Sequence, residues 1–364
     1  MTGWSGKRLT VAPGMNFPAL ETANPLTYPG WDNLLLGNKG YSFFHSSIWA
    51  RVLNESYGFT PVYFTSVANG RLETLVPLME IKGIVFAGKR GVSLPFTDYC
   101  EPIIPAGGFL RCAMDVLIGY GRRAGWRTLE IRGGGDELEG MPPSSFFYGH
   151  TIDLSKSEEE LFSSLRDSTK RNIRKALKEG VKVSRSRTPE SMGEFYRLHC
   201  LTRKRHGLPP QPYSFFRKIY QHILDKNLGF VSLALHNGRV VAAAVYFHLG
   251  SKAIYKYGAS DMHYQGLRAN NLIMWEAIKW FGRNGFTEFC FGRTEPENRG
   301  LLQFKAGWGA RQRTIKYRRF DLAQNAFVQG TPRSFSNSFP NVLFRRLPVP
   351  LLKTVGSLLY RYMG

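Results

Sequence analysis

The chain predicts an α/β protein of two domains, each a mixed sheet with helices on its faces. At 364 residues it is long for one hydrophobic core and long enough for two. Segments with the two-residue alternation of strands are interleaved with segments of helical periodicity in both halves. We expect an irregular lead-in rich in Pro and Gly, two domains and a basic tail, at residues 1–39, 40–152, 153–322 and 323–364.

The charge is strongly unbalanced, because 49 Lys and Arg stand against 27 Asp and Glu and give a net charge of +22. Such a field attracts phosphate-bearing partners, among them nucleotide-linked sugars, tRNA and an anionic membrane leaflet. A solvated basic surface is the plainer alternative.

No targeting or membrane-spanning segment is indicated. The N-terminus lacks the apolar stretch of a signal peptide, and no apolar run reaches the roughly 18 residues of a membrane span. The four cysteines have no metal-ligand spacing and predict reduced, buried thiols (Cys100, Cys112, Cys200 and Cys290). We expect a cytoplasmic protein, either free or peripheral at the inner face of the cell membrane, with no metal site.

The first domain predicts a mixed sheet and an unusual acidic segment. Its helices are expected over residues 42–58 and 109–124, and its strands over 60–67, 72–81, 126–132 and 148–154. Before the second helix, the segment SLPFTDYCEP holds Asp98 between apolar and aromatic neighbours and two prolines. A turn or a helix cap explains an aspartate here as readily as a role in chemistry.

The second domain begins with two helices, of which the second is strongly basic. A capping box at Ser157–Glu160 starts the first helix, and a cap at Asp167–Thr169 is expected to start the second. The outer face of the second helix carries Lys170, Arg171, Arg174, Lys175 and Lys178. Few acids offset their repulsion, which costs about a few tenths of a kcal/mol per pair. We predict that Lys170, Arg171 and Arg174 bind a phosphate-bearing substrate; a solvated face is the alternative.

The rest of the second domain predicts two helices, three antiparallel strands, a helix, a strand and a short helix. The strands are expected over residues 229–235, 239–249, 252–259 and 286–292. This order is that of an acetyltransferase-type (GNAT) domain. The third strand is expected to place Tyr255 and Tyr257 on one face, where they line an acyl channel or belong to the core.

The loop after this strand leads into the central helix and gathers polar side chains. Asp261 lies in the loop, and Arg268 and Asn271 lie where the helix begins. A helix entered from a strand end presents free N–H groups and a positive dipole end. The mouth of this helix therefore suits a phosphate, a carboxylate or a polarised carbonyl.

The run FGRTEPENRGLLQFKAGWG, from Phe291 to Gly309, together with YKYGASD upstream, resembles the second half of the FemABX-like transferases. It is similar above all to the shorter FemAB-related (BioF2-like) acyltransferases, which are found near exopolysaccharide genes. The larger family builds interpeptide bridges on peptidoglycan precursors. The resemblance covers residues 40–317 and implies two tandem GNAT-like domains with a crevice between them. It also implies that Asp98 faces the acceptor substrate.

The loop before the central helix bears on the acyl donor. GNAT enzymes that bind coenzyme A carry Q/R-x-x-G-x-G/A there, whereas this chain has QGLRAN over Gln265–Asn270. Because its glycine is misplaced, the match is poor. The departure favours the Fem-type arrangement, in which an aminoacyl-tRNA supplies the acyl group as a co-substrate and no cofactor is permanently bound. A thioester donor bound in another way stays open.

Acyl transfer to an amine needs a neutral amine, a polarised carbonyl and a stabilised oxyanion. Lys305 is the candidate for the oxyanion or leaving-group contact, worth roughly 3 kcal/mol; a lysine that snorkels from a short helix is the alternative. Asp98 or Asp261 takes or orients the proton of the amine. Arg293 and Phe304 are expected to bind substrate nearby. Since no Ser-His-Asp or Cys-His pattern is present, we expect direct transfer without a covalent intermediate.

The tail ends in FRRLPVPLLKTVGSLLYRYMG, whose apolar residues fall on one helical face: Leu351, Leu352, Val355, Leu358 and Leu359. Lys353, Arg361 and Arg345–Arg346 surround this stripe. A basic amphipathic helix of this kind lies on an anionic leaflet or docks on the first domain.

We therefore expect an enzyme that moves an aminoacyl or other acyl group onto an amine of a bacterial cell-envelope precursor, related to peptidoglycan or exopolysaccharide. An acyl-CoA-dependent N-acetyltransferase is the alternative among enzymes. A non-catalytic RNA- or membrane-binding protein on a GNAT-like scaffold is the alternative outside them. Lys305 and Asp98 discriminate between these classes, because a scaffold needs neither.

Overall fold

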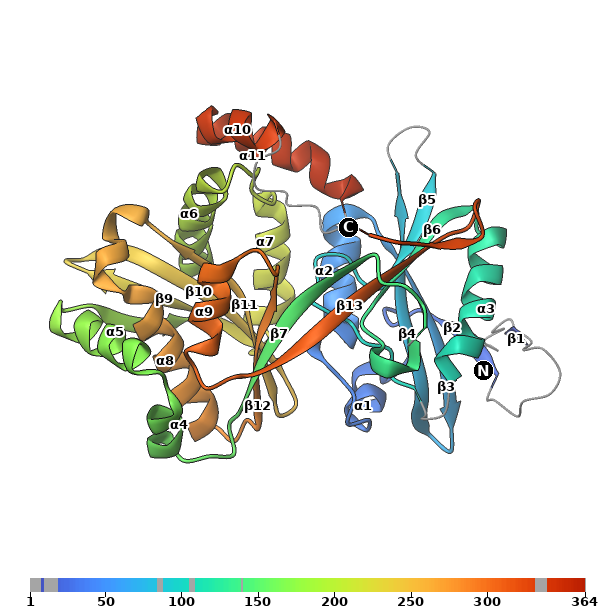
Figure 1. Ribbon diagram of the computed structural model, residues 1–364, viewed down its shortest axis with the longest axis horizontal. Coiled ribbons are helices and arrows are strands. Elements are labelled where there is room, and N and C mark those ends of the chain that lie inside the picture. The colour runs from blue at the N-terminus through green and yellow to red at the C-terminus, as the bar shows by residue number, and fades with distance from the viewer. Residues whose placement is uncertain are drawn as a thin grey trace. The chain divides into compact units, whose positions relative to one another are not determined.

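The chain forms two compact units, which Figure 1 shows in a computed structural model. The structure describes residues 8–9, 19–83, 88–104, 109–138, 140–330 and 339–363. The first unit comprises Met1–Phe147, Ile315–Arg333 and Arg361–Gly364, and the second comprises Tyr148–Thr314 and Ser334–Tyr360. Each unit contains a mixed sheet covered by helices, so the predicted α/β class is confirmed.

The first unit follows the order strand, two helices, three strands, helix, strand. These elements are β2 (Leu20–Ala23), α1 (Trp31–Leu36), α2 (Ser47–Tyr57), β3 (Thr60–Ala68), β4 (Arg71–Lys82), β5 (Lys89–Val92), α3 (Phe109–Arg123) and β6 (Trp126–Arg132). Strands β2 to β5 pair antiparallel in sequence order, and β6 pairs β5 in parallel. The short strand β1 (Arg8–Leu9) and the 3-10 helices η1 (Phe43–His45) and η2 (Gly135–Leu138) are added to this frame.

The lead-in over residues 1–39 is more regular than expected, because it contains β2 and α1. Helix α1 buries Trp31 and Leu35, which lie one turn apart, and the Trp31 indole N–H donates to the His45 carbonyl at 3.0 Å. Gly30, with φ 68°, starts this helix. The glycine that suggested irregular chain thus marks the start of a helix, because only glycine adopts this backbone at no steric cost.

The second unit repeats the order of the first. Its elements are β8 (Lys182–Ser186), α6 (Pro189–Arg205), α7 (Tyr213–Ile219) with the π-helical turn η3 (Tyr220–Leu224), β9 (Gly229–His236), β10 (Arg239–Leu249), β11 (Lys252–Ser260), α8 (Ala269–Arg283) and β12 (Glu288–Thr294). Strands β8 to β11 pair antiparallel in sequence order, and β12 pairs β11 in parallel. Helices α4 (Glu158–Ser164) and α5 (Asp167–Lys178) precede this repeat, η4 (Met262–Leu267) precedes α8, and α9 (Arg299–Ala306) follows β12.

Each unit is closed by a strand from the other half of the sequence. Strand β7 (Ser145–Asp153) follows β6 along the chain but pairs antiparallel with β12 in the second unit. Strand β13 (Arg311–Asp321) follows α9 but pairs antiparallel with β6 in the first unit, where β14 (Ala326–Val328) lies on its other edge. The units therefore divide within β7, between residues 147 and 148, whereas a boundary between 152 and 153 was expected.

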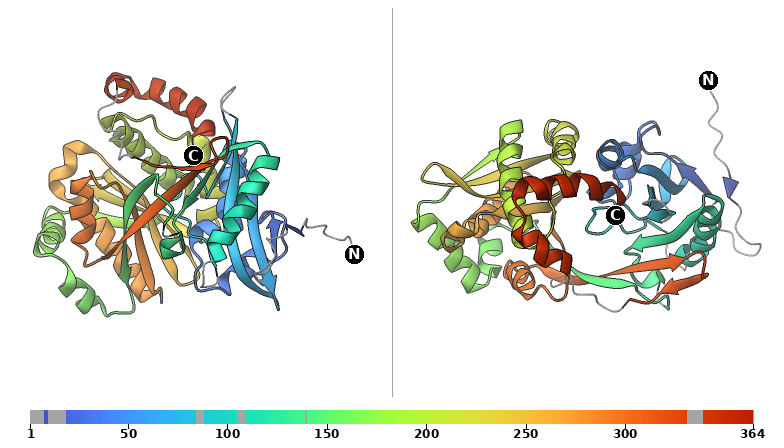
Figure 2. Two further views of the ribbon diagram at one scale, coloured as in Figure 1. Left: turned by 45° about the vertical axis from the view of Figure 1, so that its right-hand side comes forward. Right: turned by 90° about the horizontal axis from the view of Figure 1, so that it is seen from above.

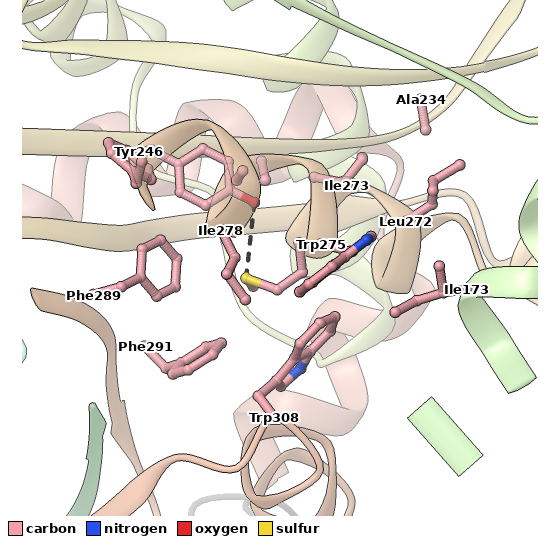
Figure 3. Close-up of a cluster of buried hydrophobic side chains, with 14 of the residues drawn as sticks. Ile173, Ala234, Tyr246, Leu272, Ile273, Trp275, Ile278, Phe289, Phe291 and Trp308 are labelled. Carbon is pink, nitrogen blue, oxygen red and sulfur yellow. Dashed lines mark hydrogen bonds between the residues drawn. The ribbon is translucent and has the colours of Figure 1, made fainter. Parts of the chain in front are cut away.

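The core of the second unit fixes the helices that surround the site. Helices α5 and α8 pack on one face of the sheet through a cluster of buried side chains, of which Figure 3 shows the centre. Tyr246 and Phe289 of the sheet meet Trp275 and Ile278 of α8 there, and Trp308 closes the cluster beside Phe291. Helices α6 and α7 cover the opposite face through their own aromatic side chains.

Most of the tail belongs to the second unit, which includes Ser334–Tyr360, whereas its last residues, Arg361–Gly364, belong to the first. Helices α10 (Phe339–Arg346) and α11 (Val349–Leu359) lie against α6, as Figures 1 and 2 show, and the 3-10 turn η5 (Tyr360–Tyr362) follows. The anchor is Tyr360, whose hydroxyl donates to the Pro209 carbonyl at 3.1 Å and accepts from Arg203 at 2.8 Å. Within the described residues, no helix is long and apolar enough to cross a membrane.

Candidate active site

A cavity of about 460 Å³ opens in the second unit, where α5, α8 and α9 approach the start of β10 and the end of β11. All of its lining residues belong to that unit. Four of the predicted site residues line it together, namely Asp261, Arg268, Asn271 and Phe304. Arg166, Ser168, Asn172 and Gln303 line it as well. The cavity therefore brings together four of the twelve predicted site residues.

Helices α5 and α8 begin at the cavity, and the residue before each of them is an arginine. Arg166 is the N-cap of α5 and Arg268 the N-cap of α8, and neither gives its helix a side-chain cap. Ser, Thr, Asp and Asn are the residues that stabilise this position. An arginine instead adds a cation to the partial positive charge of the helix end. Because both arginines line one cavity, the arrangement is complementary to a bound anion.

Arg268 also adopts a left-handed backbone, with φ 59° and ψ 25°. This residue alone joins η4 to α8, so the chain changes direction within one residue. Glycine or asparagine adopts this conformation more readily, and other residues accept it at a cost of about 1 kcal/mol. Strained backbone conformations are concentrated at functional sites, so the unusual backbone of Arg268 at the mouth of the cavity supports a ligand site there.

Strands β11 and β12 separate next to the cavity. They pair in parallel over only three residues, with Lys252–Ile254 against Glu288–Cys290. Beyond this point β11 continues along β10 to Ser260, while β12 follows β7 after a shift in register. The separation gives α9 room to bring Gly300 and Gln303 close to the end of β11, so that α9 and Ser260 of β11 both line the cavity.

A bulge in β11 places Tyr255 and Tyr257 on opposite faces of the sheet, contrary to the expected alternation. Lys256 is the extra residue, since Tyr255 and Tyr257 face consecutive residues of β10. The Tyr255 ring lies 5.7 Å from that of Tyr246 on the side of α8, and burial raises its pKa to about 12. The Tyr257 ring contacts the aromatic side chains of α6 and α7. The two tyrosines therefore cannot line one channel side by side, and neither lines the cavity.

The cations of α5 lie beside the cavity rather than in it. The Lys170 ammonium donates to a carbonyl of α4 at 2.8 Å, and the Arg174 guanidinium lies 5.8 Å from the centre of an aromatic ring of α4. Arg171 is exposed. Helix α5 instead presents Ser168 and Asn172 to the cavity. Phosphate binding by the three cations stays a prediction, on a surface next to the lining.

Asp261 lines the cavity with a carboxylate that is already engaged. One oxygen accepts from the His263 backbone N–H at 3.1 Å and so caps η4. The other accepts from the Arg239 guanidinium at 3.4 Å. The side chain is almost fully buried. These contacts fix the loop before α8 and hold a negative charge at one end of the cavity, which orients a cationic or N–H group of a substrate.

Lys305 is buried and does not line the cavity. Its side chain is 2% exposed, and its ammonium donates to the carbonyls of Gly292 and Arg293 at 3.2 and 2.9 Å. These bonds tie α9 to the end of β12, and Arg293 takes part through its backbone. Burial and, after it, the charge of the Lys305 ammonium lower the pKa of His150. Lys305 thus positions the helix that carries Phe304 to the cavity.

The Gly-Trp-Gly turn that follows holds the start of α5. The Gly307 carbonyl accepts from the backbone N–H of Arg166 at 3.0 Å. A Cβ at Gly307 would lie 2.5 Å from the Thr169 hydroxyl, so this close approach requires glycine. Trp308 is 1% exposed and fills the core behind the cavity. The Gly-Trp-Gly turn therefore positions Arg166, the arginine cap of α5.

Asp98 lies in the first unit, in a loop with two residues of unusual backbone. Leu94 and Phe96 have φ 50° and 57°, although neither is glycine. The Tyr317 hydroxyl donates to the Asp98 carbonyl at 2.6 Å, and the Arg132 guanidinium donates to the Leu94 carbonyl at 3.1 Å. Strained loops persist where their surroundings hold them, which supports a positioned loop rather than a helix cap at Asp98.

Sequence reasoning found Arg268 but missed Arg166. It placed the cap of α5 at Asp167–Thr169, because Asp, Ser and Thr are favoured caps, whereas the helix already begins at Asp167. The signal was an arginine directly before a helix start, and Arg268 carries the same signal before α8. Asn172 and Gln303 had no signal, because a neutral amide on a helix is common anywhere.

The described residues hold no cluster of three or more His, Cys, Asp or Glu side chains that could bind a metal ion. Of the four cysteine side chains, three are buried, and Cys112 is half-buried.

The part of the chain that contains the cavity matches a known family model. Residues 163–306 match the family model described as Acetyltransferase (GNAT) domain, so this part of the chain is similar to GNAT domains. Its cavity lies at the start of the central helix α8.

The chain is also similar to lipid II:glycine glycyltransferases. The protein of that name from Staphylococcus haemolyticus is 24% identical over an alignment of 226 positions, and the match covers 43% of this chain and 54% of that protein. The Staphylococcus epidermidis protein of the same name is 22% identical over an alignment of 223 positions, and the match covers 43% of this chain and 53% of that protein. The chain thus matches about half the length of these relatives.

Among solved structures, FemX is similar with a TM-score of 0.64 and 15% identity, over 78% of this chain and 94% of FemX. The C-terminal domain of a putative lysylphosphatidylglycerol synthetase from Agrobacterium fabrum reaches a TM-score of 0.51 with 13% identity, over 74% and 86%. These likenesses show the fold. The resemblance to FemABX-like proteins predicted from the motifs is confirmed.

Replacing the cap arginines should stabilise the protein and weaken anion binding at the same time. Arg166→Ser and Arg268→Asn restore favoured caps, and asparagine tolerates the left-handed backbone, so each should raise the free energy of unfolding by about 0.5–1 kcal/mol. Affinity for pyrophosphate should fall about tenfold, because a charged hydrogen-bond donor is lost. Denaturant unfolding and calorimetric titration measure the two effects.

Arg283→Ser, at the other end of α8, is the matched control, because Arg283 is exposed and pairs with Glu158. It should leave the pyrophosphate affinity unchanged. Cap variants that lose stability, or that bind pyrophosphate as the wild type does, would contradict the anion site.

Lys305→Met should lower the free energy of unfolding by about 1–3 kcal/mol, because two buried carbonyls lose their donor. Lys226→Met, at a lysine that is 65% exposed, should change it by less than about 0.5 kcal/mol. Unfolding and turnover have to be measured on one preparation. Lost turnover at unchanged stability would overturn the anchoring role and restore Lys305 as an oxyanion contact.

Proposed function

We propose that this protein is an acyltransferase that moves an aminoacyl or other acyl group onto an amine of a bacterial cell-envelope precursor. The observation that carries the proposal is the pair of arginine caps at one cavity of a GNAT domain. The cavity offers two helix ends and two guanidinium groups to a phosphate-bearing substrate. The similarity to lipid II:glycine glycyltransferases supports a peptidoglycan precursor as the acceptor class.

The reaction follows from the chemistry of the donor. The amine nitrogen attacks the acyl carbonyl and forms an amide bond, and the ester or thioester bond of the donor breaks. The leaving group departs as a ribose hydroxyl or a thiol, and the amine loses a proton. No cysteine or histidine is among the described residues that line the cavity, which supports direct transfer without an acyl-enzyme intermediate. Asp261 is the lining carboxylate placed to orient the amine.

An aminoacyl-tRNA is the proposed donor, bound as a co-substrate rather than as a resident cofactor. The loop Gln265–Asn270 departs from the coenzyme A pattern, and Arg268 occupies the cap position within it. A phosphodiester chain that leaves the cavity would also run along the exposed cations beside it, such as Arg171. An acyl-CoA-dependent N-acetyltransferase is the second candidate, favoured by the GNAT domain itself.

The location follows from the acceptor. A lipid-linked acceptor is reached from the cytoplasmic side by an enzyme that is peripheral at the inner face of the membrane, and we propose that place for this protein. A non-catalytic RNA- or membrane-binding scaffold has less support, because a scaffold does not require two arginine caps at one cavity, one of which, Arg268, has a strained backbone.

The test supplies both donors and reads the product by mass. Purified protein is incubated with lipid II in detergent and either total aminoacylated tRNA or acetyl-CoA, and intact lipid II is weighed by mass spectrometry. We expect an amino-acid increment with charged tRNA, reduced about tenfold or more in Arg166→Ser/Arg268→Asn because the anion contact is lost. Arg283→Ser should retain the wild-type rate.

An acetyl increment instead would establish the N-acetyltransferase alternative. Absence of product with either donor, while pyrophosphate still binds, would overturn the transferase proposal and favour a binding protein.

A further inference from the structure

Helix α11 is apolar on two sides, although the sequence predicted one stripe. Leu352, Gly356 and Tyr360 lie four residues apart and are buried against α6 and the segment before α7. Leu351 and Leu358 lie seven residues apart, on another line of the helix, and are 54% and 62% exposed. The stripe therefore splits into a packed side and a side that faces solvent.

The packed side fixes the orientation of the helix. A Cβ at Gly356 would collide with the Pro210 carbonyl, so the helix approaches the backbone as closely as glycine allows. Tyr360 is held by the Pro209 carbonyl and by Arg203. The Lys353 ammonium lies 5.2 Å from the centre of the Tyr196 ring. Leu351 and Leu358 are therefore held outward by the contacts on the opposite side.

Helix α10 adds a second exposed apolar patch, where Val342 and Leu343 are 45% and 48% exposed beside the exposed Arg345 and Arg346. We call the tail surface the set Val342, Leu343, Arg345, Arg346, Leu351 and Leu358. Its charge has one sign, because the chain contains no Asp or Glu after Asp321. Large exposed apolar side chains grouped in this way mark an interaction surface.

We propose that the tail surface docks on an anionic lipid bilayer. Apolar side chains that enter the acyl boundary, flanked by cations that meet lipid phosphates, are the features of a helix that lies in the membrane interface. A second copy of the chain fits poorly, because a twofold contact would pair this surface with an identical one of the same positive charge. This inference deepens the proposed location at the membrane, and its test needs no transferase activity.

The test compares vesicle binding of the full chain and matched variants. Full-length protein is sedimented with phosphatidylcholine vesicles that either contain or lack phosphatidylglycerol. Wild type should pellet with the anionic vesicles alone, and Leu351→Ser/Leu358→Ser should partition about tenfold less, because two apolar side chains no longer enter the bilayer. Leu177→Ser, which removes a leucine that is 56% exposed on α5, is the control and should bind as wild type does.

A second pair of variants tests the charges. Arg345→Ala/Arg346→Ala should also bind less to anionic vesicles and should show a weaker dependence on salt. Thermal unfolding should be unchanged in both double variants, because all four side chains are exposed.

Three outcomes would overturn the proposal. These are equal binding of wild type and Leu351→Ser/Leu358→Ser, an equal loss in Leu177→Ser, and a wild-type dimer that only the tail variant dissociates in light scattering. Transfer to a water-soluble acceptor should continue in the tail variants. A failed docking test with intact transfer would thus leave the proposed function standing, and the reverse result would leave the docking surface standing.

Discussion

Two positive helix ends, each carrying an arginine, meet at one cavity, and the rest of the second unit has to hold them there. Like charges brought together repel, so the arrangement needs support from neutral contacts. Helix α5 is fixed on α8 through Ile173 and Ala176, which are buried in the shared core. The Gly307 carbonyl at the end of α9 accepts from the Arg166 backbone N–H, so a negative helix end meets a positive one. A bound anion would relieve the repulsion that remains, which is how a preorganised site gains affinity.

The structure gives the FKAGWG run, Phe304–Gly309, a different role from the one that the sequence suggests. From the sequence, Lys305 between Phe304 and a Gly-Trp-Gly turn suggests a catalytic cation. In the structure its ammonium bonds two carbonyls at the end of β12, while Trp308 fills the core and Gly307 meets α5. A buried ammonium keeps its charge only where polar partners surround it, and backbone carbonyls supply them here. The specificity of this motif therefore reflects a joint among β12, α9 and α5.

Features that depend on the local periodicity of the sequence could be predicted from it. The order of elements from α6 to α9, the basic helix and the polar mouth of α8 were all predicted, whereas β2, α1, β5 and β8 were not. The bulge at Lys256 was not, because one extra residue leaves the alternation of side chains intact on either side of it. The buried side of α11 was not either, since leucines alone do not indicate which of them meets a partner. Burial of Leu352 beside the exposed Leu351 depends on a close backbone approach at Gly356.

The exchange of β7 and β13 between the two units could not be predicted from local sequence patterns. It also means that residues 163–306 do not contain every strand of their own sheet. The match to the domain model covers residues 163–306 and omits β7, the strand that pairs with β12. Without β7, β12 would become a sheet edge with unpaired N–H and C=O groups, although its Phe289, Cys290 and Phe291 are buried. The first unit depends in the same way on β13, which only the second half of the sequence supplies. Neither half therefore contains a complete sheet, and an acetyltransferase domain excised at its family boundaries would lack the strand that closes it.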